Sequence, residues 1–131
     1  MVAVPGMVAM PISDDQRFPA ALRGGQTYTW AKQPATSDDN ATLAFAVMKS
    51  GFVYLTADWN RQGNPAGGWQ KKCLSKEQLM AGGWQHLGQC PWEGDDRKPI
   101  ELFRKHCTAG EQYQIRVNKY WPPKLYIPPA R

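Results

Sequence analysis

Glycine and proline recur along the whole chain and leave no room for a long helix. The 131 residues include 12 Gly and 11 Pro, and both residue types destabilise helix interiors. Six Trp, five Tyr and four Phe favour strands, because aromatic side chains pack well on a pleated surface. The length is that of one ordinary domain. We therefore expect an all-β fold, an antiparallel β-sandwich of about eight strands.

The first 25 residues differ from the rest in having no clear hydrophobic period. Pro5, Gly6 and Pro11 interrupt an otherwise apolar start. We expect residues 1–25 to form an extended arm and residues 26–131 to form the single sandwich domain. No apolar run approaches the roughly 18 residues that cross a bilayer, so no membrane partner is expected. The arm lacks the basic start of a secretion signal, and the compartment stays open from these residues alone.

Alternation of side chains predicts one hairpin at Thr42–Leu55. Two apolar runs flank Lys49-Ser50-Gly51, where glycine suits the positive φ of a two-residue hairpin turn. Residues 52–55 are apolar on both faces, which is typical of a strand that is covered on both sides. A shorter strand, Thr27–Trp30, precedes this hairpin.

A second hairpin is predicted at Ile100–Val117. The turn residues Thr108-Ala109-Gly110-Glu111 separate two alternating runs. The alternative is a helix over residues 99–107, which would make the fold α+β. A last short strand at residues 124–127 lies between pairs of prolines, which suits an edge strand because proline cannot donate to a ladder.

One short helix is predicted at residues 76–81. Ser75 and Gln78 have the spacing of a capping box, and Leu74 and Leu79 that of a hydrophobic staple. Gly82 is expected to end the helix.

Several short motifs between residues 42 and 127 resemble a known family. They are Phe52-Val53-Tyr54-Leu55-Thr56-Ala57-Asp58, Gly83-Trp84, Leu102-Phe103-Arg104-Lys105 and Ala109-Gly110-Glu111. In this order they are similar to the jelly-roll, galactose-binding-like accessory domains of bacterial polysaccharide-degrading enzymes. The helix at residues 76–81 and the proline-rich end depart from that pattern. The resemblance implies a carbohydrate-binding role beside a larger parent protein or assembly, in an extracellular or periplasmic setting.

Three cysteines and two histidines raise the question of a metal site. Cys73, Cys90 and Cys107 are evenly spaced seventeen residues apart, whereas structural zinc sites usually contain a close cysteine pair. We expect no metal. One disulfide with a free thiol, in an exported protein, and three reduced thiols remain alternatives.

Catalytic patterns are weak in this sequence. His106 and Cys107 are neighbours on an expected strand, so their side chains point to opposite faces. Glu93, Asp95 and Asp96 crowd one segment without the ligand spacing of a calcium loop. No phosphate loop, dinucleotide fingerprint or serine elbow is present, so no cofactor and no catalytic residue is expected. A small hydrolase or lyase without a recognisable motif is the least favoured function.

Tryptophans in expected loops are the best candidates for ligand contact. A flat ring stacks on a sugar face or a nucleobase, and nearby amides can hydrogen-bond hydroxyl groups. The candidate ligand-binding residues are Trp59, Asn60, Asn64, Trp69, Trp92 and Trp121. We expect a non-catalytic carbohydrate-binding or accessory module that takes a carbohydrate or other polar ligand. The net charge of +5 makes a single-stranded nucleic-acid-binding module the alternative.

Overall fold

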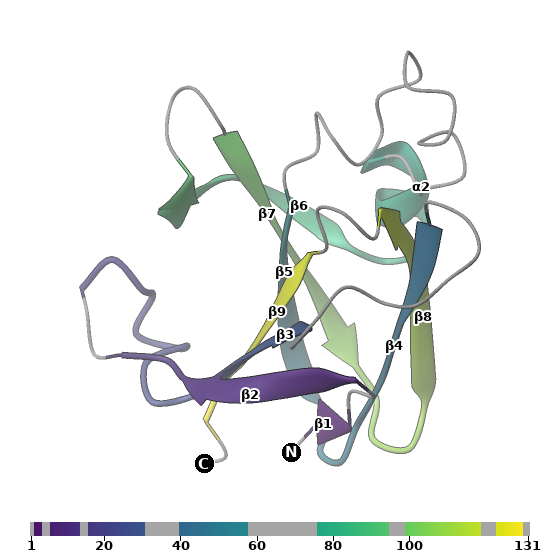
Figure 1. Ribbon diagram of the computed structural model, residues 1–131, viewed down its shortest axis with the longest axis horizontal. Helices are drawn as coiled ribbons and strands as arrows, with labels where there is room; N and C mark the ends of the chain where they lie inside the picture. Colours follow the sequence, from purple (N-terminus) through teal and green to yellow (C-terminus); the bar gives the residue numbers. More distant parts are fainter. Residues whose placement is uncertain are drawn as a thin grey trace.

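A computed structural model describes seven stretches of the chain: residues 2–3, 6–13, 16–30, 40–57, 76–94, 99–118 and 123–129. These stretches contain nine strands and one helix (Figure 1). In chain order they are β1 (Val2–Ala3), β2 (Met7–Pro11), β3 (Gln26–Trp30), β4 (Asn40–Val47), β5 (Gly51–Ala57), α2 (Lys76–Ala81), β6 (Gln85–Gly94), β7 (Pro99–Cys107), β8 (Gln112–Asn118) and β9 (Lys124–Ile127).

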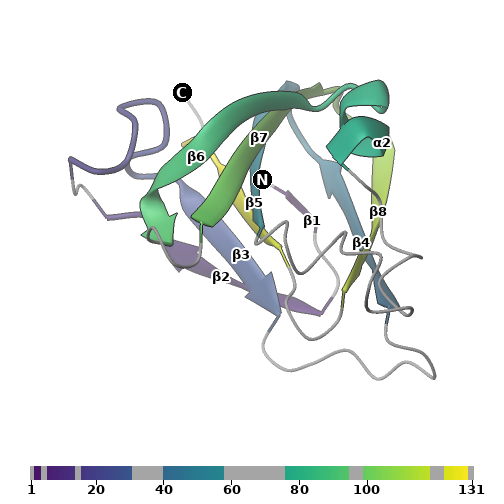
Figure 2. The same cartoon turned by 90° about the horizontal axis from the view of Figure 1, so that it is seen from above.

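The strands form two sheets, and every pairing is antiparallel. The smaller sheet has the order β1-β4-β8, and the larger one has the order β2-β3-β9-β5-β7-β6. Seen from above, β4 and β8 face the larger sheet across the molecule (Figure 2). The predicted all-β sandwich is confirmed.

The main core fills the space between the two sheets. Leu43, Phe45 and Val47 alternate along β4 and point toward the larger sheet, which contributes Leu55 and Phe103. Full burial of such a side chain stabilises the fold by about 1.5–3 kcal/mol. Alternation at period two thus places one face of each strand in the core.

A second apolar cluster covers the opposite face of the larger sheet. Tyr54, Leu102 and Tyr126 point outward from three adjacent strands, and Ile12 and Leu22 from the N-terminal region pack on them. Figure 2 shows the segment around residues 16–25 on the side of the larger sheet that faces away from β4 and β8. Strand β5 is therefore covered on both faces, which is why its sequence is apolar on both.

The N-terminal residues form part of both sheets. β1 pairs with β4, and β2 pairs with β3 over five residue pairs from Met7↔Trp30 to Pro11↔Gln26. Segment 1–25, expected as an extended arm, thus contributes one strand to each sheet.

Both predicted hairpins are wrong in their pairing, although all four strands are present. β4 pairs with β8, and β5 pairs with β7 and β9, so the turn at residues 48–50 carries the chain from one sheet to the other. The β7–β8 turn carries it back. Gly51 does not have a positive φ, so the expected hairpin turn is not formed there. The alternative helix over residues 99–107 is also wrong, because these residues form β7.

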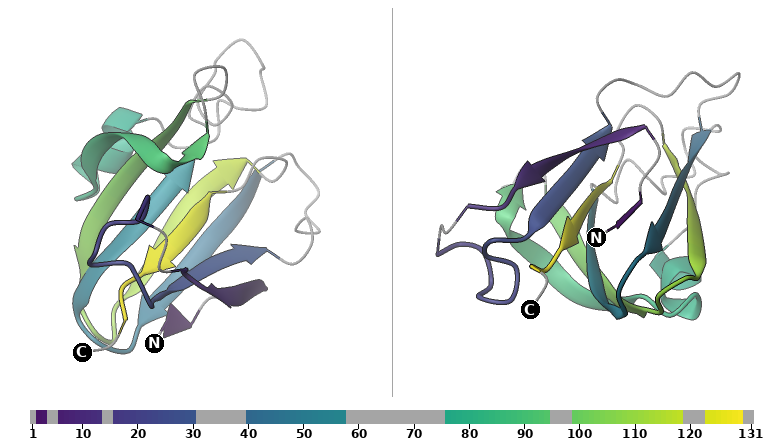
Figure 3. Two further views of the ribbon diagram at one scale, coloured as in Figure 1. Left: turned by 90° about the vertical axis from the view of Figure 1, so that its left-hand side faces the viewer. Right: turned by 90° about the horizontal axis from the view of Figure 1, so that it is seen from below.

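The two sheet-crossing turns hold each other in place. Gly110 N–H donates to the Val47 carbonyl at 3.1 Å, and Ala109 N–H donates to Ser50 Oγ at 2.9 Å. Both turns lie at the same end of the sandwich (Figure 3). Alternation identifies the buried face of a strand but not the strand it pairs with, so a hairpin and a sheet-crossing turn have the same local pattern.

Helix α2 confirms the helix predicted at residues 76–81, and its C-terminal cap is fully formed. Trp84 N–H donates to the Leu79 carbonyl at 3.2 Å, and Gly83 N–H to the Met80 carbonyl at 3.1 Å. These two bonds define a Schellman motif, in which one residue must be left-handed. That residue is Gly83, with a φ of 97°, rather than Gly82. Leu79 and Trp84 are both buried and complete the motif with a hydrophobic contact.

The position predicted for the last strand is wrong. β9 lies between β3 and β5 in the larger sheet instead of at its edge. Its four residues, Lys124–Ile127, contain no proline, so every one of them has an N–H. The prolines flank the strand and do not disturb its ladder. No helix in the described stretches is long and apolar enough to cross a membrane.

Candidate functional site

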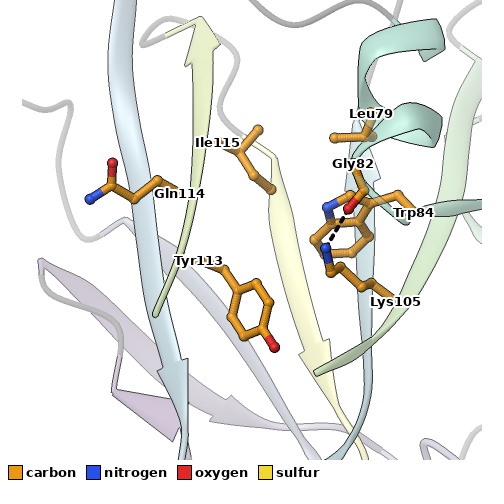
Figure 4. Close-up of a pocket in the computed structure, with 7 residues that line it drawn as sticks. All are labelled: Leu79, Gly82, Trp84, Lys105, Tyr113, Gln114 and Ile115. Atoms are coloured by element: carbon orange, nitrogen blue, oxygen red, sulfur yellow. Dashed lines mark hydrogen bonds between the residues drawn. The ribbon is translucent and has the colours of Figure 1, made fainter. Parts of the chain in front are cut away.

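The sandwich has a cleft where the ends of β8 and β6 approach helix α2. Both strands are at the edges of their sheets, so no further described strand closes the space between them. The lining residues come from both walls: Leu79, Gly82, Trp84, Lys105, Tyr113, Gln114 and Ile115. Figure 4 shows Tyr113 and Ile115 on one side and Trp84, Lys105 and Leu79 on the other.

Lys105 is the charged group of this cleft. Its Nζ donates to the Gly82 carbonyl, at the C-terminal end of α2, and lies 5.2 Å from the centroid of the Tyr113 ring. The free carbonyls at a helix C-terminus carry partial negative charge, so they stabilise a cation there. An ammonium group has three N–H donors, and one of them is used by Gly82. Lys105 therefore joins the two walls and keeps donor capacity for a ligand.

Tyr113 is held in a fixed orientation by its neighbours. One face of its ring stacks on Phe45, with centroids 5.3 Å apart and an interplanar angle of 23°. Its hydroxyl accepts from Thr108 N–H at 2.7 Å and donates to Glu111 Oε2 at 3.1 Å. Burial raises the pKa of this phenol, so it stays neutral. Phe45 therefore covers one face of the ring, and Lys105 Nζ lies over the ring at 5.2 Å from its centroid.

Trp84 lies deeper in the cleft than Tyr113. It is 5% exposed and meets Phe45 edge to face, with centroids 6.4 Å apart. The Schellman motif fixes its backbone, because Trp84 is the residue that follows the left-handed glycine. The aromatic floor of the cleft is thus positioned by the end of α2.

A histidine–carboxylate pair lies further along β6 and β7. His86 Nε2 is 3.0 Å from Glu101 Oε1, and the imidazole stacks on Phe103 with centroids 4.7 Å apart. Along β7, Glu101, Phe103 and Lys105 alternate onto one face of the strand, so this pair lies on the side of the sheet that also bears the cleft. Such a pair can hydrogen-bond a hydroxyl group.

A different cluster lies on the opposite face of the same strands. The Arg104 guanidinium carbon is 4.4 Å from the centroid of the Phe52 ring, and His106 meets that ring edge to face at 5.4 Å. Arg104 Nε donates to Gln85 Oε1 at 2.8 Å. Phe52 is 40% exposed. We refer to Phe52, Arg104 and His106 as the outer basic patch.

The structure describes only one of the predicted ligand-binding residues. Trp92 is half-buried in the second cluster, where its ring contacts Phe18 and Tyr126 with centroids 5.4 Å away in each case. Its Nε1 is buried and makes no hydrogen bond with a described residue. The other predicted residues, Trp59, Asn60, Asn64, Trp69 and Trp121, lie outside the described residues, and for them the prediction stays a prediction.

Sequence reasoning missed the residues that line the cleft. Trp84 and Lys105 stand in the short motifs that carry the resemblance, but nothing in those motifs indicates a ligand contact. Tyr113 is one apolar position in an alternating strand, and a lysine on a strand is ordinary surface by sequence alone. Only the topology, which places the starts of β6 and β8 next to α2, brings the three together.

The described cysteines are buried free thiols on opposite faces of the larger sheet. Cys90 belongs to the second apolar cluster and Cys107 to the main core, so they do not form a disulfide with each other. Burial raises the pKa of Cys90 to about 12 and that of Cys107 to about 11. Cys73 lies outside the described residues, where its pairing is not tested.

Carboxylates and histidines of the described stretches form no metal centre. No group of three or more His, Cys, Asp or Glu there gathers closely enough to hold an ion. Glu93, from the acidic segment that lacks the spacing of a calcium loop, accepts from the Tyr126 hydroxyl at 3.1 Å and pairs with Lys124 Nζ at 3.0 Å. Asp95 and Asp96 lie outside the described residues.

Comparison with known proteins adds no further identification. No family model, curated protein or solved structure matches this chain.

Proposed function

We propose that this chain is a non-catalytic binding module that takes a saccharide in the cleft between β8, β6 and α2. The observation that supports the proposal is the meeting of an aromatic ring and an ammonium group from opposite sheets, Tyr113 and Lys105. Saccharide binding needs an apolar face together with a few hydrogen-bond donors. The cleft offers both on one small surface.

The remaining lining residues fit a ligand of mixed polarity. Leu79 and Ile115 are apolar and buried, and they flank the aromatic floor. Gly82 contributes a carbonyl, which accepts hydrogen bonds. A sugar ring could place its C–H face on Tyr113 and its hydroxyl groups toward Lys105 and this carbonyl. The resemblance of residues 42–127 to jelly-roll accessory domains supports the same role, beside a catalytic partner in a larger polypeptide or assembly.

A glycan array followed by calorimetric titration tests the proposal. Tyr113→Leu keeps an apolar contact with Phe45 but removes the aromatic face. Stacking of a flat ligand on an aromatic ring contributes about 1–3 kcal/mol, so this variant should bind about 5- to 150-fold more weakly. Phe52→Leu, at an exposed ring on the other face of the sheet, is the matched control and should bind as the wild type does. Absence of saccharide binding by the wild-type chain would reject the proposal.

A second candidate function is single-stranded nucleic-acid binding, and the outer basic patch favours it. Phe52 offers a partly exposed ring, and Arg104 has no carboxylate partner among the described residues. Aromatic rings stack on bases, and arginine binds phosphate. Binding at this patch should weaken steeply with salt, because phosphate contacts release counterions. A neutral saccharide in the cleft should show almost no salt dependence, so one titration at two salt concentrations separates the two functions.

A further inference from the structure

Strand β2 lies at the edge of the larger sheet as the described residues form it. It is the terminal strand in the sheet order, and its described partner is β3 alone. Natural sheet edges usually carry charged residues that discourage pairing with another chain. The stretch Gly6–Ile12 contains no charged residue, and Val8 and Met10 are 44% and 57% exposed. Among the described residues, no strand pairs with this side of β2.

The hydrogen-bonding direction of β2 follows from its register. Ile12 N–H donates to the Gly25 carbonyl at 3.0 Å, and this pair continues the ladder one step beyond Pro11↔Gln26. In an antiparallel ladder the bonded pairs alternate with non-bonded ones. Met10 and Val8 therefore also direct their N–H and C=O groups toward β3. Met7, Ala9 and Pro11 direct theirs away from the sheet, and Pro11 has no N–H to leave unpaired.

We propose that β2 pairs with β2 of a second copy of this chain, antiparallel and centred on Ala9. In this register Ala9 N–H donates to the carbonyl of the partner's Ala9, and Met7 N–H donates to the carbonyl of the partner's Pro11. The two-fold axis repeats both bonds. All four outward N–H groups of the two strands find an acceptor. Pro11 has no N–H, so it leaves no unpaired donor in this register.

The side chains fit the same register. Val8 lies opposite the partner's Met10, in a non-bonded pair, where side chains approach most closely. The pair covers the two exposed apolar groups of the strand on one face of the joined sheet. No charge in Gly6–Ile12 opposes a like charge across the axis. The net charge of +5 still repels a second copy at long range, so added salt should strengthen the association.

Sedimentation velocity over a wide range of protein concentrations tests the proposal on the full chain. The wild type should show a reversible monomer–dimer equilibrium. The double variant Val8→Lys/Met10→Lys places lysines opposite each other on both sides of the axis and should weaken the dimer at least about tenfold. Met48→Lys/Met80→Lys adds the same charge at exposed methionines outside β2, and should leave the dimer almost unchanged.

A second variant tests the backbone bonds without changing charge. Ala9→Pro removes the central outward N–H, at a position where an edge strand tolerates proline. It should abolish the dimer while circular dichroism and the thermal unfolding midpoint show a folded monomer. A wild-type chain that stays monomeric at every concentration would overturn the proposal. So would a dimer that survives both Ala9→Pro and the double lysine substitution.

Discussion

Replacing Gly83 by alanine should destabilise the fold and disturb the cleft together. Gly83 has a φ of 97°, and an L side chain in the left-handed region costs about 1–2 kcal/mol. A Cβ at this position would also lie 3.1 Å from Lys105 Nζ and 3.5 Å from its Cε. The lysine ammonium must then shift by a few tenths of an ångström, which weakens its hydrogen bond to the Gly82 carbonyl. A hydrogen bond to a charged group contributes about 1.5–3 kcal/mol, and partial exposure of Lys105 places its loss below that range, at about 1 kcal/mol. The total expected loss is about 2–3 kcal/mol.

Denaturant unfolding with two control glycines separates the two contributions. Gly110 has a φ of 85°, and a Cβ there would meet no atom within 4 Å, so Gly110→Ala should show the backbone strain alone. Gly51 has neither a positive φ nor a close neighbour, so Gly51→Ala should change the free energy of unfolding by less than about 0.5 kcal/mol. If Gly83→Ala were as stable as Gly51→Ala, the assignment of the Schellman motif would be refuted. If it matched Gly110→Ala, Lys105 would contribute nothing to the cap.

Three further predictions concern the core and the thiols. Phe103→Ala, at a fully buried ring, should cost about 3–5 kcal/mol of unfolding free energy, whereas Phe52→Ala at the 40% exposed ring of the neighbouring strand should cost less than about 1 kcal/mol; equal losses would contradict the assigned burial. Because burial raises the pKa of Cys90 from 9.0 to about 12, the folded state favours the neutral thiol; this stabilisation is present below pH 9 and is lost as the pH rises toward 12, by at most about 1.4 kcal/mol per pH unit. The free energy of unfolding, measured from pH 8 to 11, should therefore fall less steeply with pH for Cys90→Ala than for the wild type. Equal slopes would show that the pKa of this thiol does not change on folding. In a Cys73→Ser background, a thiol-specific reagent near pH 8 should label neither Cys90 nor Cys107 until the chain is unfolded, and rapid labelling of the native protein would contradict their burial.

Alternation in the sequence was sufficient to predict strands such as β4 and β8, but not their partners, and the strands β1 and β2 were expected only as an extended arm. Period-two alternation in residues 42–47 and 112–117 reports a buried face, and β4 and β8 are indeed half-buried strands. The same alternation is compatible with a hairpin or a sheet-crossing turn, because both reverse the chain over a few residues. Choosing between them requires knowing that β4 and β8 pair with each other, which is a contact between residues about 70 positions apart in the chain.

Local signals predicted the helix well and its cap only in part. The capping box, the hydrophobic staple and Gly82 identified residues 76–81, because helix ends have strong local requirements. Which of Gly82 and Gly83 is left-handed depends on where Trp84 must be buried, and that is set by the core. The cleft was not predictable for the same reason: Lys105 and Tyr113 are on strands of different sheets and meet only in three dimensions.

The most direct test of the proposed function compares two neighbouring basic residues that point to opposite faces of β7. An oligosaccharide selected on the glycan array is titrated by calorimetry into the wild type, Lys105→Met and Arg104→Met, since Lys105 lines the cleft and Arg104 belongs to the outer basic patch. Saccharide binding in the cleft predicts at least about a tenfold higher Kd for Lys105→Met, consistent with loss of a charge-assisted hydrogen bond, and an unchanged Kd for Arg104→Met. An unchanged Kd for Lys105→Met, or a weakening confined to Arg104→Met, would contradict the assignment of the cleft as the binding site.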